Sequence, residues 1–277
     1  MKRRISTFLL CLLIFCSGTL TAAENKEGTT MAKGQKNKIY QVMWQGENIS
    51  GQLMINGFTI SQFQGGAVTG SAALNIWLTG SNEIKSTINK KDPTASASFS
   101  LGVSELVMGD VASTSDRGNL INIELINADL SSQAPKNISE KFNSTMDFSR
   151  HLLSVKPPQF KEQEVLDYAI KLYGLFQEKD AKSILQEMLV KTEDYAQAYY
   201  QPVANVVKAF SSLLKEDILQ NKLVKIDPKK LRAERVNNLW HIYEEKKELI
   251  RSKSSDGSTS ELPIFIGDIN GKLMVVR

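Results

Sequence analysis

Cysteine and histidine are nearly absent from this sequence. Cys11 and Cys16 are the two cysteines, and both lie close to Met1. The two histidines, His151 and His241, have no second histidine, aspartate or glutamate at metal-ligand spacing, so a zinc site is not expected. A Gly-x-Ser-x-Gly elbow is missing, a Ser-x-x-Lys nucleophile in a suitable context is missing, and no glycine-rich loop leads into a phosphate-binding helix. We therefore predict no metal and no cofactor.

Long hydrophobic runs are also lacking. The longest, from Phe8 to Phe15, is far shorter than the ~20 residues of a membrane span. It follows the basic residues 2–4 and precedes Thr21-Ala22-Ala23, a pattern typical of a signal peptide that is cleaved after residue 23. A retained membrane anchor is the alternative. Lipid attachment at Cys16 is disfavoured, because the preceding Phe15 is bulky where such sites hold a small residue.

Loss of residues 1–23 would remove three basic side chains and lower the formal charge from +4 to +1. A nearly neutral chain is a poor nucleic-acid binder. The same cleavage would remove both cysteines, which excludes disulfides and thiolate catalysis. An exported chain of this size without cysteine indicates a bacterial periplasm, with secretion as the alternative. Residues 24–36 are polar and are expected to form a disordered lead.

Residues 37–150 are predicted to form an all-β sandwich. Apolar and polar residues alternate from Lys38 to Trp44, and further short apolar runs are separated by Gly, Asn, Asp and Ser. Asn56-Gly57 provides the positive φ angles of a tight hairpin turn. A second turn is expected at residues 80–82. No window of residues 38–130 has helical periodicity.

This β region resembles the galactose-binding-like jelly rolls of carbohydrate-active proteins. The matching positions are an apolar-Asn-Gly-aromatic strand and a following Leu-Leu-Gly-Asn-Ile pattern: Ile55, Asn56, Gly57, Phe58, Leu74, Leu78, Gly80, Asn82 and Ile84. In that family these positions are scaffold turns, so the resemblance implies a fold and not a ligand. Trp77 and Trp44 either stack on a sugar ring or, as we favour, belong to the core.

Residues 151–160 are interpreted as a linker, because Pro157-Pro158 forbids a helix. After it we expect an α+β domain at 161–277 with three helices. The first is predicted within 160–176, the second is capped by Asp180, and the third runs from about Glu193 to Lys215, with Pro202 kinking or dividing it. Short strands follow, ending in a hairpin at Asn270-Gly271.

The order of these elements is similar to the cone-shaped ketosteroid-isomerase-like fold. The ending of that fold, two strands with an apolar-Gly…Gly-Lys-apolar pattern, matches residues 264–273, which read Ile-Phe-Ile-Gly-Asp-Ile-Asn-Gly-Lys-Leu. In enzymes of this fold an Asp or His projects into the cone. No position of this sequence can be matched to that role, so the resemblance implies an α+β body of helices on a curved antiparallel sheet, and no activity.

Few side chains are candidates for a functional role. His241, between Trp240 and Ile242 on an expected strand, is the weak catalytic candidate, with a structural imidazole as the favoured interpretation. Glu193-Asp194 is expected to cap a helix start. Tyr195, Tyr199 and Tyr200 cluster on one helix, where they either pack into the core or contact a partner.

We therefore predict an exported, periplasmic binding protein without catalytic activity, whose partner is another protein. An immunity protein that neutralises a toxic effector in the periplasm is one version. A small-molecule hydrolase or isomerase acting in the C-terminal cone is an alternative, and a carbohydrate-binding protein using Trp77 is another. Nucleic-acid binding and stable membrane insertion after cleavage are not expected.

Overall fold

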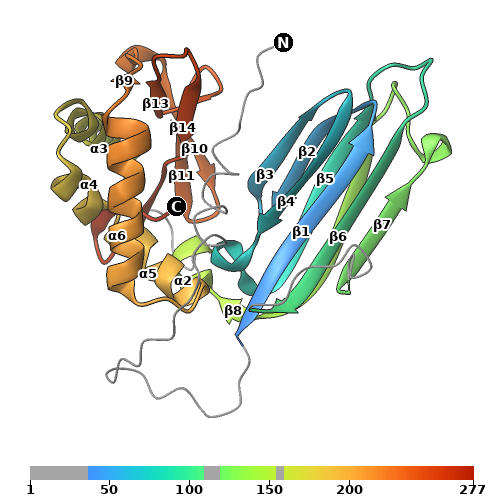
Figure 1. Cartoon of the computed structure of the whole chain (residues 1–277), viewed down its shortest axis with the longest axis horizontal. Helices are drawn as coiled ribbons and strands as arrows, with labels where there is room; N and C mark the ends of the chain where they lie inside the picture. The colour runs from blue at the N-terminus through green and yellow to red at the C-terminus, as the bar shows by residue number, and fades with distance from the viewer. Residues whose placement is uncertain (1–36, 109–118, 154–158) are drawn as a thin grey trace. The chain divides into compact units, whose positions relative to one another are not determined.

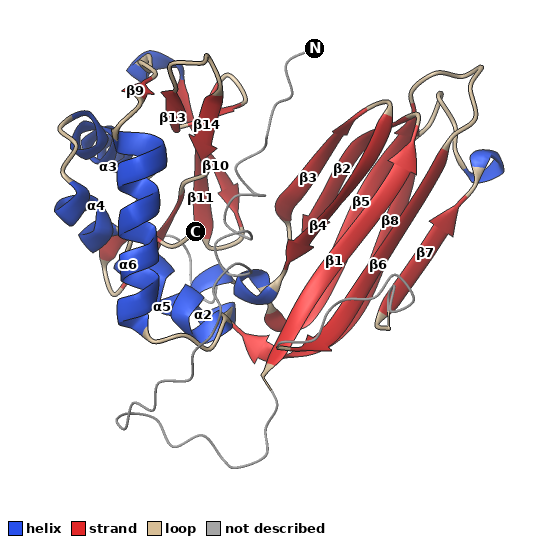
Figure 2. Ribbon diagram, in the orientation of Figure 1, coloured by secondary structure: helices blue, strands red, loops and turns tan. Residues whose placement is uncertain are grey.

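The computed structural model describes residues 37–108, 119–153 and 159–277. The predicted signal peptide, the lead at 24–36 and Pro157-Pro158 of the predicted linker lie outside these residues. The chain divides into two compact units. Of the described residues, the first unit holds 37–75, 81–108 and 119–145, and the second holds Ile76–Gly80, 146–153 and 159–277. Four antiparallel sheets and five helices form these units, so the chain is mostly β, with the helices in its C-terminal part (Figure 2).

The first unit contains two four-stranded sheets (Figure 1). One has the order β4-β1-β6-β7, from β1 (Lys38–Glu47), β4 (Ala67–Ala73), β6 (Ser98–Val107) and β7 (Ile121–Leu125). The other has the order β3-β2-β5-β8, from β2 (Ile49–Ile55), β3 (Phe58–Gln64), β5 (Thr79–Lys90) and β8 (Lys136–Asp147). Short 3-10 turns, η1 (Asn75–Trp77) and η3 (Asn127–Asp129), join strands.

The two sheets share one core because apolar residues alternate along their strands. Tyr40 and Val42 of β1 and Leu53 and Ile55 of β2 are fully buried. Rings bridge the sheets: the centroids of Phe63 on β3 and Phe99 on β6 lie 5.6 Å apart. The predicted hairpin turn is confirmed, since Ile55 pairs with Phe58 and both turn residues have positive φ, 49° at Asn56 and 86° at Gly57.

The second unit begins with the helix α2 (Ser149–Leu152), which includes residues assigned to the linker by the sequence analysis. The helices α3 (Glu162–Gln177), α4 (Ala181–Glu187), α5 (Leu189–Ala198) and α6 (Val203–Leu213) follow, and α6 continues into the π-helical turn η4 (Leu214–Leu219). The predicted N-cap is confirmed, because the Asp180 carboxylate accepts a hydrogen bond from the Ser183 amide. Pro202 divides the helix expected from 193 to 215, which is one of the two outcomes predicted for this proline, and it occupies the N-cap position of α6.

The helices of the second unit pack beside two antiparallel sheets (Figure 2). The larger has the order β10-β11-β15-β16, with β10 (Leu231–Val236), β11 (Leu239–Glu244), β15 (Phe265–Ile269) and β16 (Lys272–Val275), and β12 (Lys247–Glu248) pairs with β11. The smaller contains β14 (Thr259–Leu262), β13 (Ile250–Lys253) and β9 (Lys222–Leu223), and the turn η5 (Pro228–Lys230) precedes β10. The predicted final hairpin is confirmed by the pairing of Ile269 with Lys272.

Apolar side chains fill the space between these helices and strands. Val165, Leu172 and Phe176 of α3 and Ile242 of β11 belong to one buried cluster with Ile266 of β15. The apolar stripe of α3 and the apolar faces of β11 and β15 therefore pack against one another in a single core. Among the described residues, no helix has both the length and the apolar character needed to cross a membrane.

Candidate functional site

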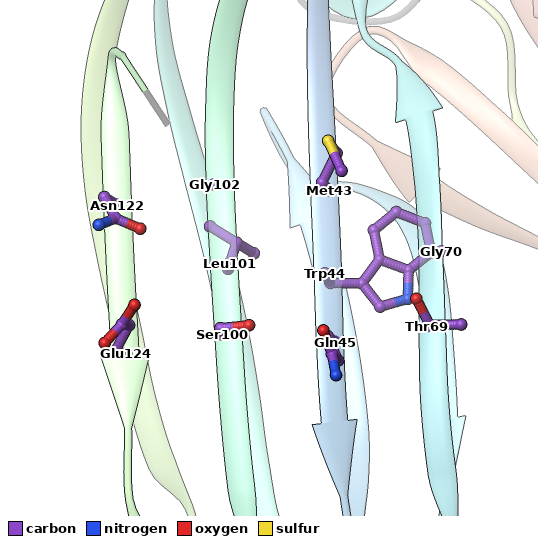
Figure 3. Close-up of a pocket in the computed structure, with 10 residues that line it drawn as sticks. All are labelled: Met43, Trp44, Gln45, Thr69, Gly70, Ser100, Leu101, Gly102, Asn122 and Glu124. Carbon is purple, nitrogen blue, oxygen red and sulfur yellow. The ribbon is translucent and has the colours of Figure 1, made fainter. Parts of the chain in front are cut away.

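An open polar strip crosses the outer face of the sheet β4-β1-β6-β7. Two cross-strand rows form it: Thr69, Gln45, Ser100 and Glu124 in one, and Met43, Gly102 and Asn122 in the next. Figure 3 shows these residues arranged strand by strand. Their neighbours along each strand point into the core, because side chains alternate between the two faces of a sheet.

The strip is open because its centre has almost no side chains. Gly102 forms the floor beside Met43, and Ser100 contributes only a hydroxymethyl group. Glu124 is the one charged residue among the ten that line the strip. Hydroxyl and amide groups that can both donate and accept hydrogen bonds therefore dominate the surface, and they suit an uncharged polar ligand.

Trp44 lines the same strip at its β4 side. Its indole lies across Gly70, where an added Cβ would come within 2.4 Å of the ring, and Figure 3 shows the ring directed toward β4. The ring centroid also lies 6.5 Å from that of Phe63. Trp44 is half-buried, and because it alternates with Met43 and Gln45 along β1, its ring packs on the inner face of the sheet, behind the strip.

Trp77, which the sequence offered as a sugar platform or a core residue, is 5% exposed. Its ring meets Phe265 edge-on at 5.8 Å, and the Arg277 guanidinium lies 6.0 Å from its centroid. This position in the second unit matches the core interpretation. The buried ring does not present a flat face to a ligand.

The three clustered tyrosines lie at the turn between α5 and α6. Tyr195 contacts Tyr199, with centroids 5.7 Å apart, and meets the ring of Phe210 on α6 at 5.2 Å. Of the three tyrosines expected on one helix, only Tyr195 lies within α5, which ends at Ala198: Tyr199 is its C-cap, and Tyr200 follows in the left-handed region, with φ 55°. All three tyrosines are half-buried, and Val203, the first residue of α6, is 43% exposed. We call Tyr195, Tyr199, Tyr200 and Val203 the tyrosine turn.

His241 makes a structural contact on β11. Its Nε2 lies 2.9 Å from the Glu248 carboxylate, and its ring stacks on Phe265 at 4.6 Å. The alternation of β11 places His241 on the face opposite Ile242, which belongs to the apolar core of the second unit. The imidazole therefore does not point into the apolar core of the second unit, where the cone hypothesis would need a base.

A charged cluster that the sequence analysis missed lies inside the second unit. The Arg277 guanidinium donates through Nη1 to Asp194 Oδ2 at 2.6 Å and through Nε to the Ile76 carbonyl at 2.9 Å. The Asp194 carboxylate also meets His151 Nδ1 at 2.8 Å. The side chains of Arg277 and Asp194 are 0% and 1% exposed, and the Phe148 ring lies 5.4 Å from the guanidinium. We call His151, Asp194 and Arg277 the buried cluster.

The expected capping role of Asp194 is wrong. Helix α5 begins at Leu189, so Glu193 and Asp194 occupy its middle and not its first turn. Burial by itself raises the pKa of the Asp194 carboxyl, but the hydrogen bond from His151 and the charge of Arg277 outweigh it and hold the pKa below its usual value. Asp194 is thus an ionised partner within the buried cluster.

A second hollow lies between α3, α4 and the β15–β16 hairpin. Its lining includes Phe160, Tyr168, Lys171 and Leu273. The Tyr168 hydroxyl donates to Glu187 at 2.7 Å. Burial first, and the neighbouring Glu187 second, raise the pKa of Tyr168. This tyrosine therefore stays protonated and acts as a hydrogen-bond donor.

Among the described residues, the second unit contains two buried arginines, Arg251 and Arg277, and only Arg251 has its carboxylate partner nearby in the sequence. Arg251 on β13 pairs with Glu244, the last residue of β11, which is only seven positions earlier in the chain. Arg277 and Asp194 are 83 positions apart, and no sequence periodicity links them. Within the described residues, no group of three or more His, Cys, Asp or Glu side chains could hold a metal ion.

Comparison of the chain with protein-family models, with curated proteins and with solved structures found no match. The resemblances to jelly rolls and to ketosteroid-isomerase-like cones thus remain interpretations of the sequence.

Proposed function

We propose that this chain is an exported, periplasmic binding protein that contacts another protein through the tyrosine turn. The observation that carries the proposal is the position of Tyr199, Tyr200 and Val203 together at one helix turn, half-buried or exposed. Tyrosine is enriched among the residues that contribute most binding energy at protein interfaces. Its ring offers a large contact area, and its hydroxyl offers a hydrogen bond at low entropic cost.

The internal packing of the turn supports this role. Tyr195 is fixed between Tyr199 and Phe210, and the Lys191 ammonium lies 6.0 Å from the Phe210 centroid. The outer rings are therefore held by a rigid inner layer. A surface that is ordered before binding loses less conformational entropy when a partner docks.

The assignment of the finer fold belongs to the same proposal. We infer that the first unit is a jelly-roll-like sandwich, because rings of Phe63 and Phe99 connect its two sheets. We infer that the second unit is a cone-like α+β body, because helix α3 shares its apolar core with β11 and β15. An apolar filling suits a scaffold that presents surfaces. An immunity protein against a toxic effector is one such use.

The test is capture of the partner from the native cell envelope with the tagged chain, followed by reconstitution from purified components. The variant Tyr199→Ala/Tyr200→Ala should lose most of the binding, since each anchor at the centre of an interface contributes about 2 kcal/mol or more. The control Asn122→Ala/Glu124→Ala, on the sheet of the first unit, should bind as the parent does.

A purified partner that binds both variants as tightly as the parent chain would refute the role of the tyrosine turn. Failure to recover any stoichiometric protein would count against protein binding itself. Circular dichroism of each variant establishes that the fold is intact before binding is compared.

A second candidate function is carbohydrate binding on the polar strip. Its support is the lining of Gln45, Thr69, Ser100 and Asn122, which offers uncharged donors and acceptors over a glycine floor. Sugar hydroxyls match such groups. Titration of the chain with envelope polysaccharide should then give a signal that Asn122→Ala/Glu124→Ala abolishes and Tyr199→Ala/Tyr200→Ala retains. The opposite pattern would exclude the strip.

A further inference from the structure

Strand β7 is an edge strand with an unusual composition. Within the part of the chain that the structure describes, β7 pairs with β6 alone and closes the order β4-β1-β6-β7. Large apolar side chains flank it on both sides: Leu120 is 38% exposed and Ile126 is 66% exposed. An exposed apolar strand edge presents backbone donors and acceptors to a second strand.

Other edges in the first unit lack this combination. β8, at the edge of the second sheet, carries the charged residues Lys136, Glu140 and Lys141, which discourage strand addition. β4, at the far edge of the same sheet as β7, has no large apolar side chain among the exposed ones. Residues 119–126 contain neither lysine nor proline, so the one charged side chain on β7 is that of Glu124.

The sequence of this edge is complementary to itself in an antiparallel arrangement. A twofold axis through Ile123 would place Leu120 opposite Ile126 of the other copy and Ile121 opposite Leu125. Asn122 would face Glu124, so that an amide donor meets a carboxylate. Every cross-strand pair is then either apolar with apolar or donor with acceptor, which are the favourable cross-strand combinations.

The neighbouring registers are worse. A register must keep facing residues on the same side of the sheet, so it changes in steps of two residues. A twofold axis at Glu124 would set the two carboxylates opposite each other. An axis at Asn122 would set Leu120 opposite Glu124. The register centred on Ile123 is therefore the one that buries the exposed apolar side chains without a charge conflict.

We propose that two copies of this chain associate through antiparallel pairing of their β7 edges, centred on Ile123. The contact joins two four-stranded sheets into one of eight strands, with an isologous interface in which each copy uses the same residues. It covers Leu120 and Ile126 and continues the polar strip from one copy to the other, because Asn122 and Glu124 belong to both features. The inference is independent of the tyrosine turn.

The first experiment measures the dimer constant of the chain from Glu24 onward by sedimentation equilibrium. The variant Asn122→Glu places two carboxylate pairs face to face and should weaken the dimer roughly three- to thirtyfold, from two like-charge pairs per dimer. Asn122→Lys places an ammonium opposite each carboxylate and should hold or strengthen the dimer, more so at low salt. Both changes are at an exposed position, so the β6–β7 pairing is preserved.

The matched control is a pair of apolar-to-lysine changes at similar exposure. Leu120→Lys, at a 38% exposed position, should weaken the dimer about tenfold or more, because it removes two apolar contacts and adds two charges at the edge. Ile170→Lys, at a 37% exposed position on α3, should leave the dimer constant unchanged. Equal effects of the two variants, or a chain that stays monomeric up to about 1 mM, would overturn the proposal.

Single cysteines report the register directly, since the chain from Glu24 onward contains no other thiol. Ile123→Cys should form a disulfide-linked dimer under oxidation, because paired residues at the twofold axis have Cβ atoms close enough to be bridged. Asn122→Cys and Glu124→Cys, each one residue away on the opposite face of the sheet, should link far more slowly. Faster linkage at 122 or 124 than at 123 would refute the register.

Discussion

Replacing Asp194 with asparagine removes one charge from the buried cluster and keeps the size of the side chain. The carboxylate accepts a hydrogen bond from Arg277 Nη1 at 2.6 Å, and neither side chain is more than 1% exposed. The variant leaves the Arg277 guanidinium buried without its counter-ion. Breaking a buried ion pair from one side costs about 3–5 kcal/mol, so the free energy of unfolding of the second unit should fall by about that amount.

A double variant separates the loss of the pair from the burial of an uncompensated charge. Arg277→Met removes the guanidinium, including its bonds to the Ile76 and Val276 carbonyls. In the double variant with Asp194→Asn, neither position 194 nor position 277 carries a charge. We expect the double variant to be less destabilised than the sum of the two single variants, because replacing both members of a buried pair by neutral groups is often nearly neutral.

Urea unfolding followed by tryptophan fluorescence measures this effect in the second unit alone. Trp44 belongs to the first unit, whereas Trp77 and Trp240 belong to the second, so a Trp44→Phe background isolates the second signal. The slope of free energy against urea shows whether the unfolded surface has changed. Glu245→Gln is the control, because Glu245 pairs with Lys230 at the surface and should change the midpoint little.

The reasoning fails if Asp194→Asn unfolds within about 1 kcal/mol of its parent at an unchanged slope, the typical cost of an ordinary point mutation. It fails equally if the surface control Glu245→Gln produces a loss of the same size. Either result would mean that the buried cluster is not an ion pair that holds α5 to Arg277.

Three further predictions concern single groups. Because the pKa of Asp194 is lower in the folded than in the unfolded chain, its ionisation stabilises the fold; this contribution is complete above the unfolded pKa of about 3.9 and is lost as pH falls toward the folded pKa. Urea unfolding between about pH 5 and pH 3 should therefore show that acid destabilises the parent more than it destabilises Asp194→Asn. Gly51→Ala should lower the free energy of thermal unfolding by at least about 2 kcal/mol, because φ at Gly51 is 145° and an added Cβ would lie 1.8 Å from the Thr87 carbonyl oxygen. The control Gly66→Ala, whose added Cβ would have nothing within 4 Å, should lower it by about 1 kcal/mol. Equal losses in the two variants would contradict this prediction. Asn56→Ala should lose about 1–3 kcal/mol by the same measurement, since its side chain accepts from the Glu83 amide at 2.8 Å, and an unchanged melting temperature would exclude that role.

The strands and hairpins of this protein could be predicted because their signals are local. Asn56-Gly57 and Asn270-Gly271 each adopt the positive φ angles that their residue types favour, and the apolar alternation around them sets which face is buried. The helix α3 followed from its apolar stripe. The division at Pro202 also followed from one residue, because proline has no amide hydrogen and suits only the first turn of a helix.

The polar strip could not be predicted, because it depends on which strands are neighbours. Ser100 and Glu124 lie on the consecutive strands β6 and β7, but Gln45 lies on β1, which β2 to β5 separate from β6 in the chain and which pairs with β6 only in the folded sheet. Each residue alone reads as an ordinary exposed position on an alternating strand. Only the sheet order turns them into one surface.

The sequence did not predict the buried cluster, for a different reason. Glu193-Asp194 has the composition of a helix start, and the N-cap interpretation assumed that the helix begins there. In the structure Met188 precedes the first helical residue of α5, so Asp194 lies in the sixth helical position. It is buried like Val190 and Ala198, each of which is four positions away from it on the same helix. An apolar residue is expected at such a position. The carboxylate occupies it because Arg277, far along the chain, supplies the compensating charge, and a residue that breaks the local pattern is therefore evidence of a distant partner.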